Sequence, residues 1–170
     1  MLSAHVVRML EQHANGLADE VVRDLTGNPR TPSFHARSQD ELRRRAQRIY
    51  NLAVEFLATG DQRTLQVEFA GVGRQRFREG IPIEEVVYAL LRTKHHLRRR
   101  LRSVSGLTSE FELHSEVELD LQLGRFFDLL LYGAVRGYED ARNEAAHPEK
   151  RHTPSRFTLE ETATKHDWVL

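Results

Sequence analysis

Residues 121–135 read LQLGRFFDLLLYGAV, and this stretch decides the fold. Its polar members are few: Gln122, Arg125, Asp128 and Tyr132. Apolar residues therefore occur on nearly every side of a helix built from it, which is typical of a helix that lies centrally in a bundle or in an interface between chains. The helical spacing extends in both directions, so we predict one long helix from about residue 110 to residue 145.

Helical periodicity also dominates the sequence before this helix. Residues 38–41, SQDE, form a capping box, and Gly60, Gly80 and Pro82 suit helix ends. The sequence therefore predicts four earlier helices, with a loop between the first and the second; they span residues 3–25, 38–59, 61–80 and 82–104. No segment alternates with period two. We predict an all-α fold, a single bundle of about five helices over residues 1–146, followed by a polar C-terminal extension at 147–170.

Length and composition limit the classes of protein to which the chain can belong. It has 170 residues, with 25 Lys and Arg, 25 Asp and Glu, and no Cys. A domain of this size buries a core without a metal or a disulfide. The absence of Cys excludes disulfides, thiolate zinc sites, cysteine nucleophiles and attached c-type haem. No run approaches the ~18 apolar residues of a membrane span, so we expect a cytoplasmic protein with no membrane partner.

The second half of the helix at 82–104 is basic and the first part of the next helix is acidic. A short turn at 103–109 makes these two helices antiparallel neighbours. We therefore expect the basic and acidic runs to neutralise one another and to set the register of the hairpin, rather than to bind a polyanion. No nucleic-acid partner is expected, and a nucleic-acid-binding regulator that uses the helices at 38–59 and 82–104 is the least favoured alternative.

Three charged residues interrupt apolar stripes, and they are the candidate ligand-binding residues. Lys94 occupies the centre of a heptad pattern that runs from Ile83 to Val104. Arg76 and Asp128 face the predicted core from their own helices. Because an unpaired buried charge is costly, we predict that Arg76 pairs with Asp128, with Lys94 as the alternative partner of Asp128. Structural ion pairing is favoured over a ligand anchor for all three.

No motif for catalysis or for a cofactor is present. The sequence has no Gly-x-Ser-x-Gly, no Walker A and no dinucleotide fingerprint. The spacing of the nine histidines fits neither a di-metal bundle nor a His-x-x-x-His zinc site. We therefore expect no catalytic residue, no metal and no cofactor. The alternative is a small-molecule or haem-type binding bundle that uses Lys94 or His13.

Glycines recur at helical spacing in two of the predicted helices. Gly71 and Gly73 lie beside Phe69 and Val72, while Gly133 and Gly137 lie in the last helix. A glycine cradle for phosphate would need a loop rather than helical spacing. We therefore predict that these glycines allow close approach between helices.

Residues 73–90, GRQRFREGIPIEEVVYAL, resemble the N-terminal sensory domain of RsbRD-type proteins, the RsbT co-antagonists of bacterial stress signalling. Residues 5–10 with 29–34, and residues 126–139, resemble the opening and the last helix of the same family, so the resemblance covers about residues 1–145. It implies an all-helical, non-enzymatic regulatory domain that forms dimers. In that family a STAS or kinase module typically follows, and none follows here. The implied signalling partner therefore acts in trans, or the sequence is a piece of a longer protein.

The last helix has more apolar surface than one stripe of a five-helix monomer needs. One face carries Leu119 with the predicted interface residues Leu123, Phe126, Leu130 and Ala134. A second face carries Leu121, Phe127, Leu131, Val135 and Tyr138. Because an exposed apolar patch is usually an interface, and because the resemblance points the same way, we predict a homodimer. A closed monomer with this helix at its centre is the alternative.

Overall fold

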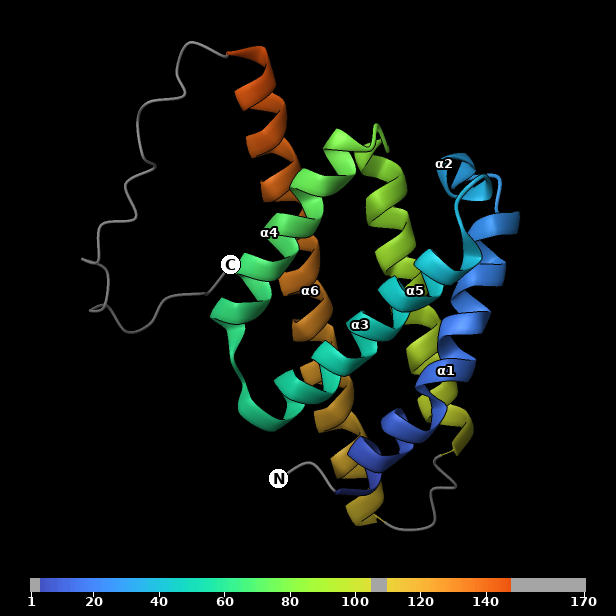
Figure 1. Ribbon diagram of the computed structural model, residues 1–170. Helices are drawn as coiled ribbons and strands as arrows, with labels where there is room; N and C mark the ends of the chain where they lie inside the picture. Colours follow the sequence, from blue (N-terminus) through green and yellow to red (C-terminus); the bar gives the residue numbers. More distant parts are fainter. Residues whose placement is uncertain (1–3, 105–109, 148–170) are drawn as a thin grey trace, which may run out of the picture.

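The computed structural model describes residues 4–104 and 110–147, without the side chains of 4–11, 104 and 110–116. Over these residues the chain forms helices and no strand, which confirms the predicted all-α class. Five helices are long and one is a single turn (Figure 1). Their bounds are α1 Ala4–Gly27, α2 Pro32–His35, α3 Gln39–Thr59, α4 Gln62–Arg78, α5 Ile83–Val104 and α6 Glu110–Ala146.

The helix ends follow local side-chain chemistry. The Ser38 hydroxyl accepts a hydrogen bond from the backbone N–H of Glu41, and the Asp61 carboxylate accepts one from Thr64 at the start of α4. Gly60 and Gly80 take φ values of 69° and 70°, in the left-handed region that closes helices at low cost. The predicted helix ends at these residues are confirmed. The predicted cap at Ser3 and most of the extension at 147–170 lie outside the described residues.

The segment between α1 and α3, predicted as a loop, contains the one-turn helix α2. Thr31 is fully buried, and its hydroxyl donates to the Leu25 carbonyl at 2.8 Å. The backbone N–H and the hydroxyl of Ser33 each donate to the Glu85 carboxylate at 2.9 Å. Phe34 is buried in the core. Because Glu85 belongs to a distant part of the chain, local sequence spacing did not reveal its contact with this turn.

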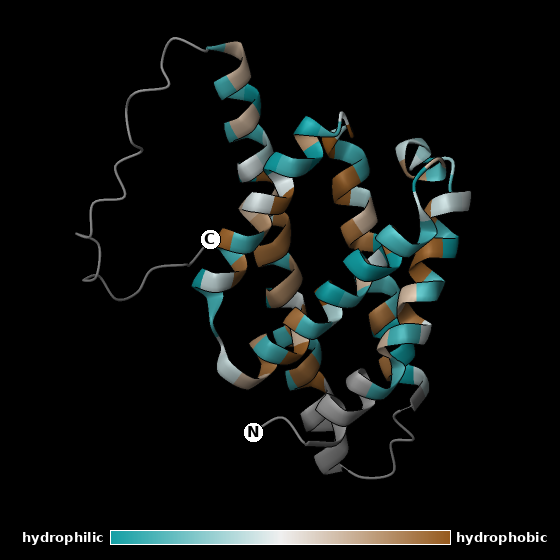
Figure 2. Cartoon of the chain, viewed as in Figure 1, coloured by the Kyte–Doolittle hydropathy of each residue, from teal (hydrophilic) through white to brown (hydrophobic). Residues whose placement is uncertain are grey.

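Helix α6 packs mainly against α4 and also contacts α3 and α5, while α1 packs on α3 and α5 (Figure 1). Colouring by hydropathy shows brown apolar residues along much of α5 and α6 (Figure 2). The Phe126 ring lies 5.7 Å from the Phe56 ring of α3 and 5.1 Å from the Phe127 ring, measured between centroids. The middle of α6 therefore supplies the centre of the chain's own core.

This arrangement corrects the predicted interface. Leu123, Phe126, Leu130 and Ala134 have no exposed surface in the single chain. The prediction placed them between chains because the sequence does not say which face of α6 the other helices cover. The face that α3 and α4 cover is the one with these residues. Part of the second face is exposed instead, with Leu121 at 69% and Val135 at 36% exposed.

Helices α4 and α6 touch through glycines. A methyl group added at Gly73 would lie 1.9 Å from the Ala134 carbonyl oxygen, and one at Gly137 would lie 1.9 Å from the Ala70 carbonyl oxygen. At Gly133 the nearest atoms would be 3.0 and 3.1 Å away. The predicted close approach is confirmed at these three positions. Gly71 has open space around it, so its predicted packing role is wrong.

Candidate functional site

The predicted pair between Arg76 and Asp128 does not form. Arg76 is 7% exposed, and its Nη1 donates to Glu79 Oε2 at 2.7 Å, three residues later on the same chain segment. The Asp128 side chain is 74% exposed and lies 3.7 Å from Lys94 Nζ, which was the alternative partner. Asp128 is on the outer side of α6, beyond the reach of a guanidinium buried on α4. A pair that is this exposed contributes little to stability.

Glu79, just after α4, binds three guanidiniums, from α3, from α4 and from the turn between α2 and α3. Arg37 Nη1 lies 3.2 Å from Glu79 Oε2, Arg45 Nη2 donates to Oε1 at 2.9 Å, and Arg76 Nη1 donates to Oε2. Arg45 also pairs with Glu41 on its own helix. The three guanidiniums therefore face two carboxylates, and the cluster keeps a surplus positive charge. We call Arg37, Arg45, Arg76, Glu41 and Glu79 the arginine cluster.

Burial and charge act in opposite directions on this cluster. Burial alone would raise the pKa of Glu79, but the hydrogen bond from Arg45 and the charge of Arg76 outweigh it and hold that pKa below its usual value. Burial lowers the pKa of Arg76, and the nearby positive charge of Arg45 lowers it further. Arginine nevertheless stays protonated at neutral pH, so the surplus charge persists.

Replacing Glu79 with glutamine is expected to destabilise the fold by about 2 kcal/mol at pH 7, because three clustered guanidiniums lose their shared carboxylate. A depressed carboxyl pKa contributes stability that is complete above the unfolded-state pKa and is lost as the pH falls through the folded-state pKa. The difference between the wild type and Glu79→Gln should therefore shrink as the pH falls from about 5 toward 3. Urea denaturation at several pH values measures it. A difference that is constant with pH would contradict an ionised Glu79.

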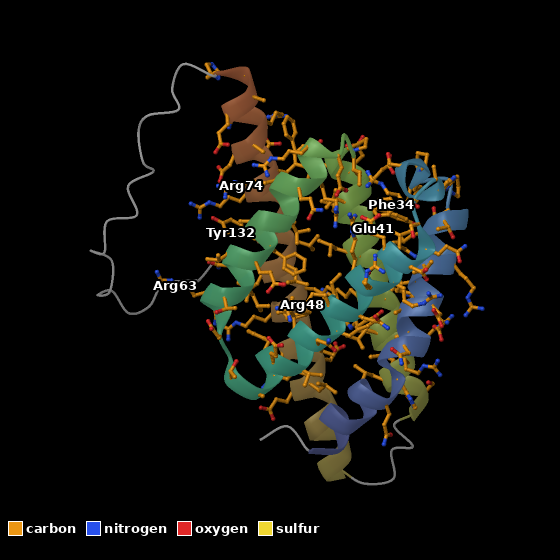
Figure 3. The ribbon with its side chains drawn as sticks, viewed as in Figure 1. Phe34, Glu41, Arg48, Arg63, Arg74 and Tyr132 are labelled. Carbon is orange, nitrogen blue, oxygen red and sulfur yellow. The ribbon has the colours of Figure 1, made fainter. Side chains whose placement is uncertain are left out.

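A pocket of about 200 Å³ lies beside the arginine cluster, between α1, α2, α3, α4 and α5. Its walls are mainly apolar and include Val21, Phe34, Ala46, Val72 and Leu90. Arg45, Arg48 and Arg76 reach its surface. Arg48 points from α3 toward α4 and is held there by two hydrogen bonds of 2.8 Å to the Glu68 carboxylate (Figure 3). We call this space the central pocket.

The basic run of α5 pairs with two helices rather than with α6 alone. Arg98 pairs with Asp120 of α6, and Lys94 with Asp128, as the predicted hairpin requires. Other arginines of this run pair with acidic residues of α1. Glu20 accepts hydrogen bonds from Arg99 and Arg100, and Asp24 accepts one from Arg92 at 2.6 Å. His96, 7% exposed, lies between these two carboxylates. The prediction missed α1, because Glu20 and Asp24 are distant in sequence.

An exposed row of side chains follows the outer side of α6. Spacings of three and four residues place Val117, Leu121, Gly124, Asp128, Tyr132 and Val135 on one narrow stripe of the helix. Val117 is 59%, Leu121 69% and Tyr132 56% exposed. Leu91 of α5, 43% exposed, lies one turn before Lys94 and extends the apolar surface. We call these seven residues the outer stripe.

The sequence profile of the RsbT co-antagonist protein rsbRD N-terminal domain matches residues 15–152. The chain belongs to this family. Family membership makes it a regulatory domain of stress signalling. No curated protein and no solved structure matches the chain significantly. Both the arginine cluster and the outer stripe lie within the part of the chain that the RsbRD-type domain covers.

Within this RsbRD-type domain, sequence reasoning found Arg76 but missed its partners. Glu79 follows Arg76 at the i+3 spacing of a helical ion pair, which is a signal that could have found it. Arg37 and Arg45 come from other elements and carry no such signal. Over the described residues no group of three or more His, Asp or Glu side chains could hold a metal ion, and no helix is long and apolar enough to cross a membrane. His13 is half-buried on α1.

Proposed function

We propose that this domain is a non-enzymatic cytoplasmic regulator that acts as a homodimer and contacts a signalling protein in trans. The observation that carries the proposal is the outer stripe. It lies on the side of α6 opposite to α4, whose contacts run through Gly133 and Gly137. A monomer has no use for a row of apolar side chains this exposed, and a second copy of the chain is the simplest cover for it.

The outer stripe is self-complementary in an antiparallel arrangement. With a twofold axis near Asp128, Leu121 lies opposite the partner's Val135, and Tyr132 lies opposite the partner's Gly124. Because Gly124 has no side chain, the Tyr132 ring has room to pack against the partner's helix at that position. The two Asp128 carboxylates approach one another at the axis, and each carries its own Lys94 at 3.7 Å to offset the repulsion.

Tyr132→Glu is expected to convert the dimer to a monomer, because it places a charge in the apolar contact on each side of the axis. Multi-angle light scattering at micromolar concentration should give the mass of two chains for the wild type and of one chain for Tyr132→Glu. The helical circular dichroism signal should not change, since Tyr132 is exposed in the single chain.

The matched control is Val67→Glu, on α4. Val67 is 68% exposed and lies outside the outer stripe, so this variant should remain a dimer. A wild-type mass of one chain at every concentration would reject the proposed association. A dimer that Tyr132→Glu leaves intact would place the interface elsewhere on the molecule.

A further inference from the structure

The arginine cluster and the central pocket lie next to one another, and neither is explained by association. Arg45 and Arg76 belong to both. The Arg76 guanidinium makes one hydrogen bond, from Nη1 to Glu79, and among the described residues its Nε and Nη2 have no acceptor. A side chain that is 7% exposed thus has unused donors beside an apolar space. Solvent reaches these donors, so a ligand with an acceptor group would replace water there.

Charge favours an anion as that acceptor. The arginine cluster carries a surplus positive charge, and the third arginine on the pocket wall, Arg48, is already neutralised by Glu68. A carboxylate suits the planar guanidinium because it can accept two parallel hydrogen bonds from it. Apart from Glu68, which Arg48 neutralises, and the uncharged Gln75 and Thr93, the rest of the pocket wall is apolar. It offers contact to a hydrocarbon body, with Val21, Phe34 and Leu90 among its residues.

The size of the pocket limits the ligand. A cavity of about 150 Å³ accommodates a benzene ring, and drug-sized ligands need about 300 Å³ or more. A pocket of about 200 Å³ therefore suits an organic acid of about ten non-hydrogen atoms. We propose that the central pocket binds a small apolar monocarboxylate, with its carboxylate on Arg76 and Arg45 and its hydrocarbon body between α1, α3 and α5.

This binding goes beyond the proposed function, because it names the chemical class of molecule that the regulatory domain would sense. Its meaning as a signal rests on the regulatory role, but the binding itself requires no dimer. The ligand would contact α1, α3, α4 and α5 at once, so its arrival changes the packing of these helices. Calorimetry tests ligand binding, and light scattering tests the dimer. A monomeric chain that binds the ligand would reject the proposed dimer but not the proposed binding.

The test is calorimetric titration of the full chain at pH 7 with sodium octanoate, and with 1-octanol as a neutral probe of the same size. Octanoate should bind once per chain and about tenfold or more tightly than octanol, because only the carboxylate has a negative charge and two oxygens to pair with a guanidinium. This comparison needs no variant. Absence of octanoate binding at millimolar concentration, or equal binding of octanol, overturns the proposal.

Two variants locate the site. Arg76→Gln should weaken octanoate binding by about tenfold or more while Glu79 keeps its other two arginines. Ala46→Leu extends a side chain from α3 into the pocket and should abolish binding. Arg44→Gln, an exposed arginine on the same helix, is the matched control and should bind as the wild type does. Binding that survives both pocket variants would place the ligand elsewhere and overturn the assignment.

Discussion

Gly137→Ala is expected to destabilise the domain by about 3 kcal/mol, a large part of the ~5–15 kcal/mol that holds an ordinary domain together. Its new methyl group would lie 1.9 Å from the Ala70 carbonyl oxygen and 2.6 Å from the Ala70 Cα. Both atoms belong to the backbone of α4, so no side chain can rotate away. The two helices must separate, and every contact between them weakens. Thermal and urea denaturation followed by circular dichroism measure the loss.

A pair of glycines on α4 provides the control for this effect. Gly73→Ala should be as damaging as Gly137→Ala, because its methyl group would meet the Ala134 carbonyl oxygen at 1.9 Å. Gly71→Ala, two residues away, meets nothing within 4 Å and should stabilise the helix by about 0.5–1 kcal/mol. Equal effects at Gly71 and Gly73 would show that helix propensity, rather than the contact between α4 and α6, sets the outcome.

The ends of the helices could be predicted from the sequence because they depend on neighbouring residues. Ser38 and Asp61 cap through hydrogen bonds to backbone groups three residues later, and Gly60 and Gly80 supply the left-handed backbone. The glycines of α6 were predictable for a similar reason, since their spacing alone places them on one face. The one-turn helix α2 was not predicted, and part of what holds it is distant in sequence, since Ser33 donates two hydrogen bonds to Glu85 of α5.

The charge pairs show where the reasoning from sequence ends. Lys94 and Asp128 were recognised as charges within apolar stripes, and the distance of 3.7 Å between them confirms the alternative pairing. The sequence could not rank this pair above Arg76 with Asp128, because the choice depends on how α4 and α5 are rotated against α6. The arginine cluster forms because α3, α4 and the turn before α3 come together at Glu79, and no single spacing in the sequence predicts that contact.

The two faces of α6 present the same limit. Both faces are apolar in sequence, and either could have faced the core. Gly133 and Gly137 contact α4, and this orientation of α6 places Phe126 and Leu130 in the core. It leaves Leu121 exposed. The close contact between glycines therefore decides which apolar residues remain available to a partner. Hydrophobicity alone does not indicate which face of α6 packs against α4. The small size of Gly133 and Gly137 does indicate it.

Leu130→Glu tests this orientation of α6 directly. Leu130 has no exposed surface, so glutamate would place a carboxylate in the core without a partner. The expected loss is roughly 4 kcal/mol or more, a large part of the ~5–15 kcal/mol that stabilises an ordinary domain, and urea denaturation measures it. Leu121→Glu adds the same charge on the 69% exposed side of the same helix and should keep the helical circular dichroism signal. A Leu130→Glu protein that keeps the stability of the wild type and becomes monomeric would instead place Leu130 between chains and reject the present orientation of α6.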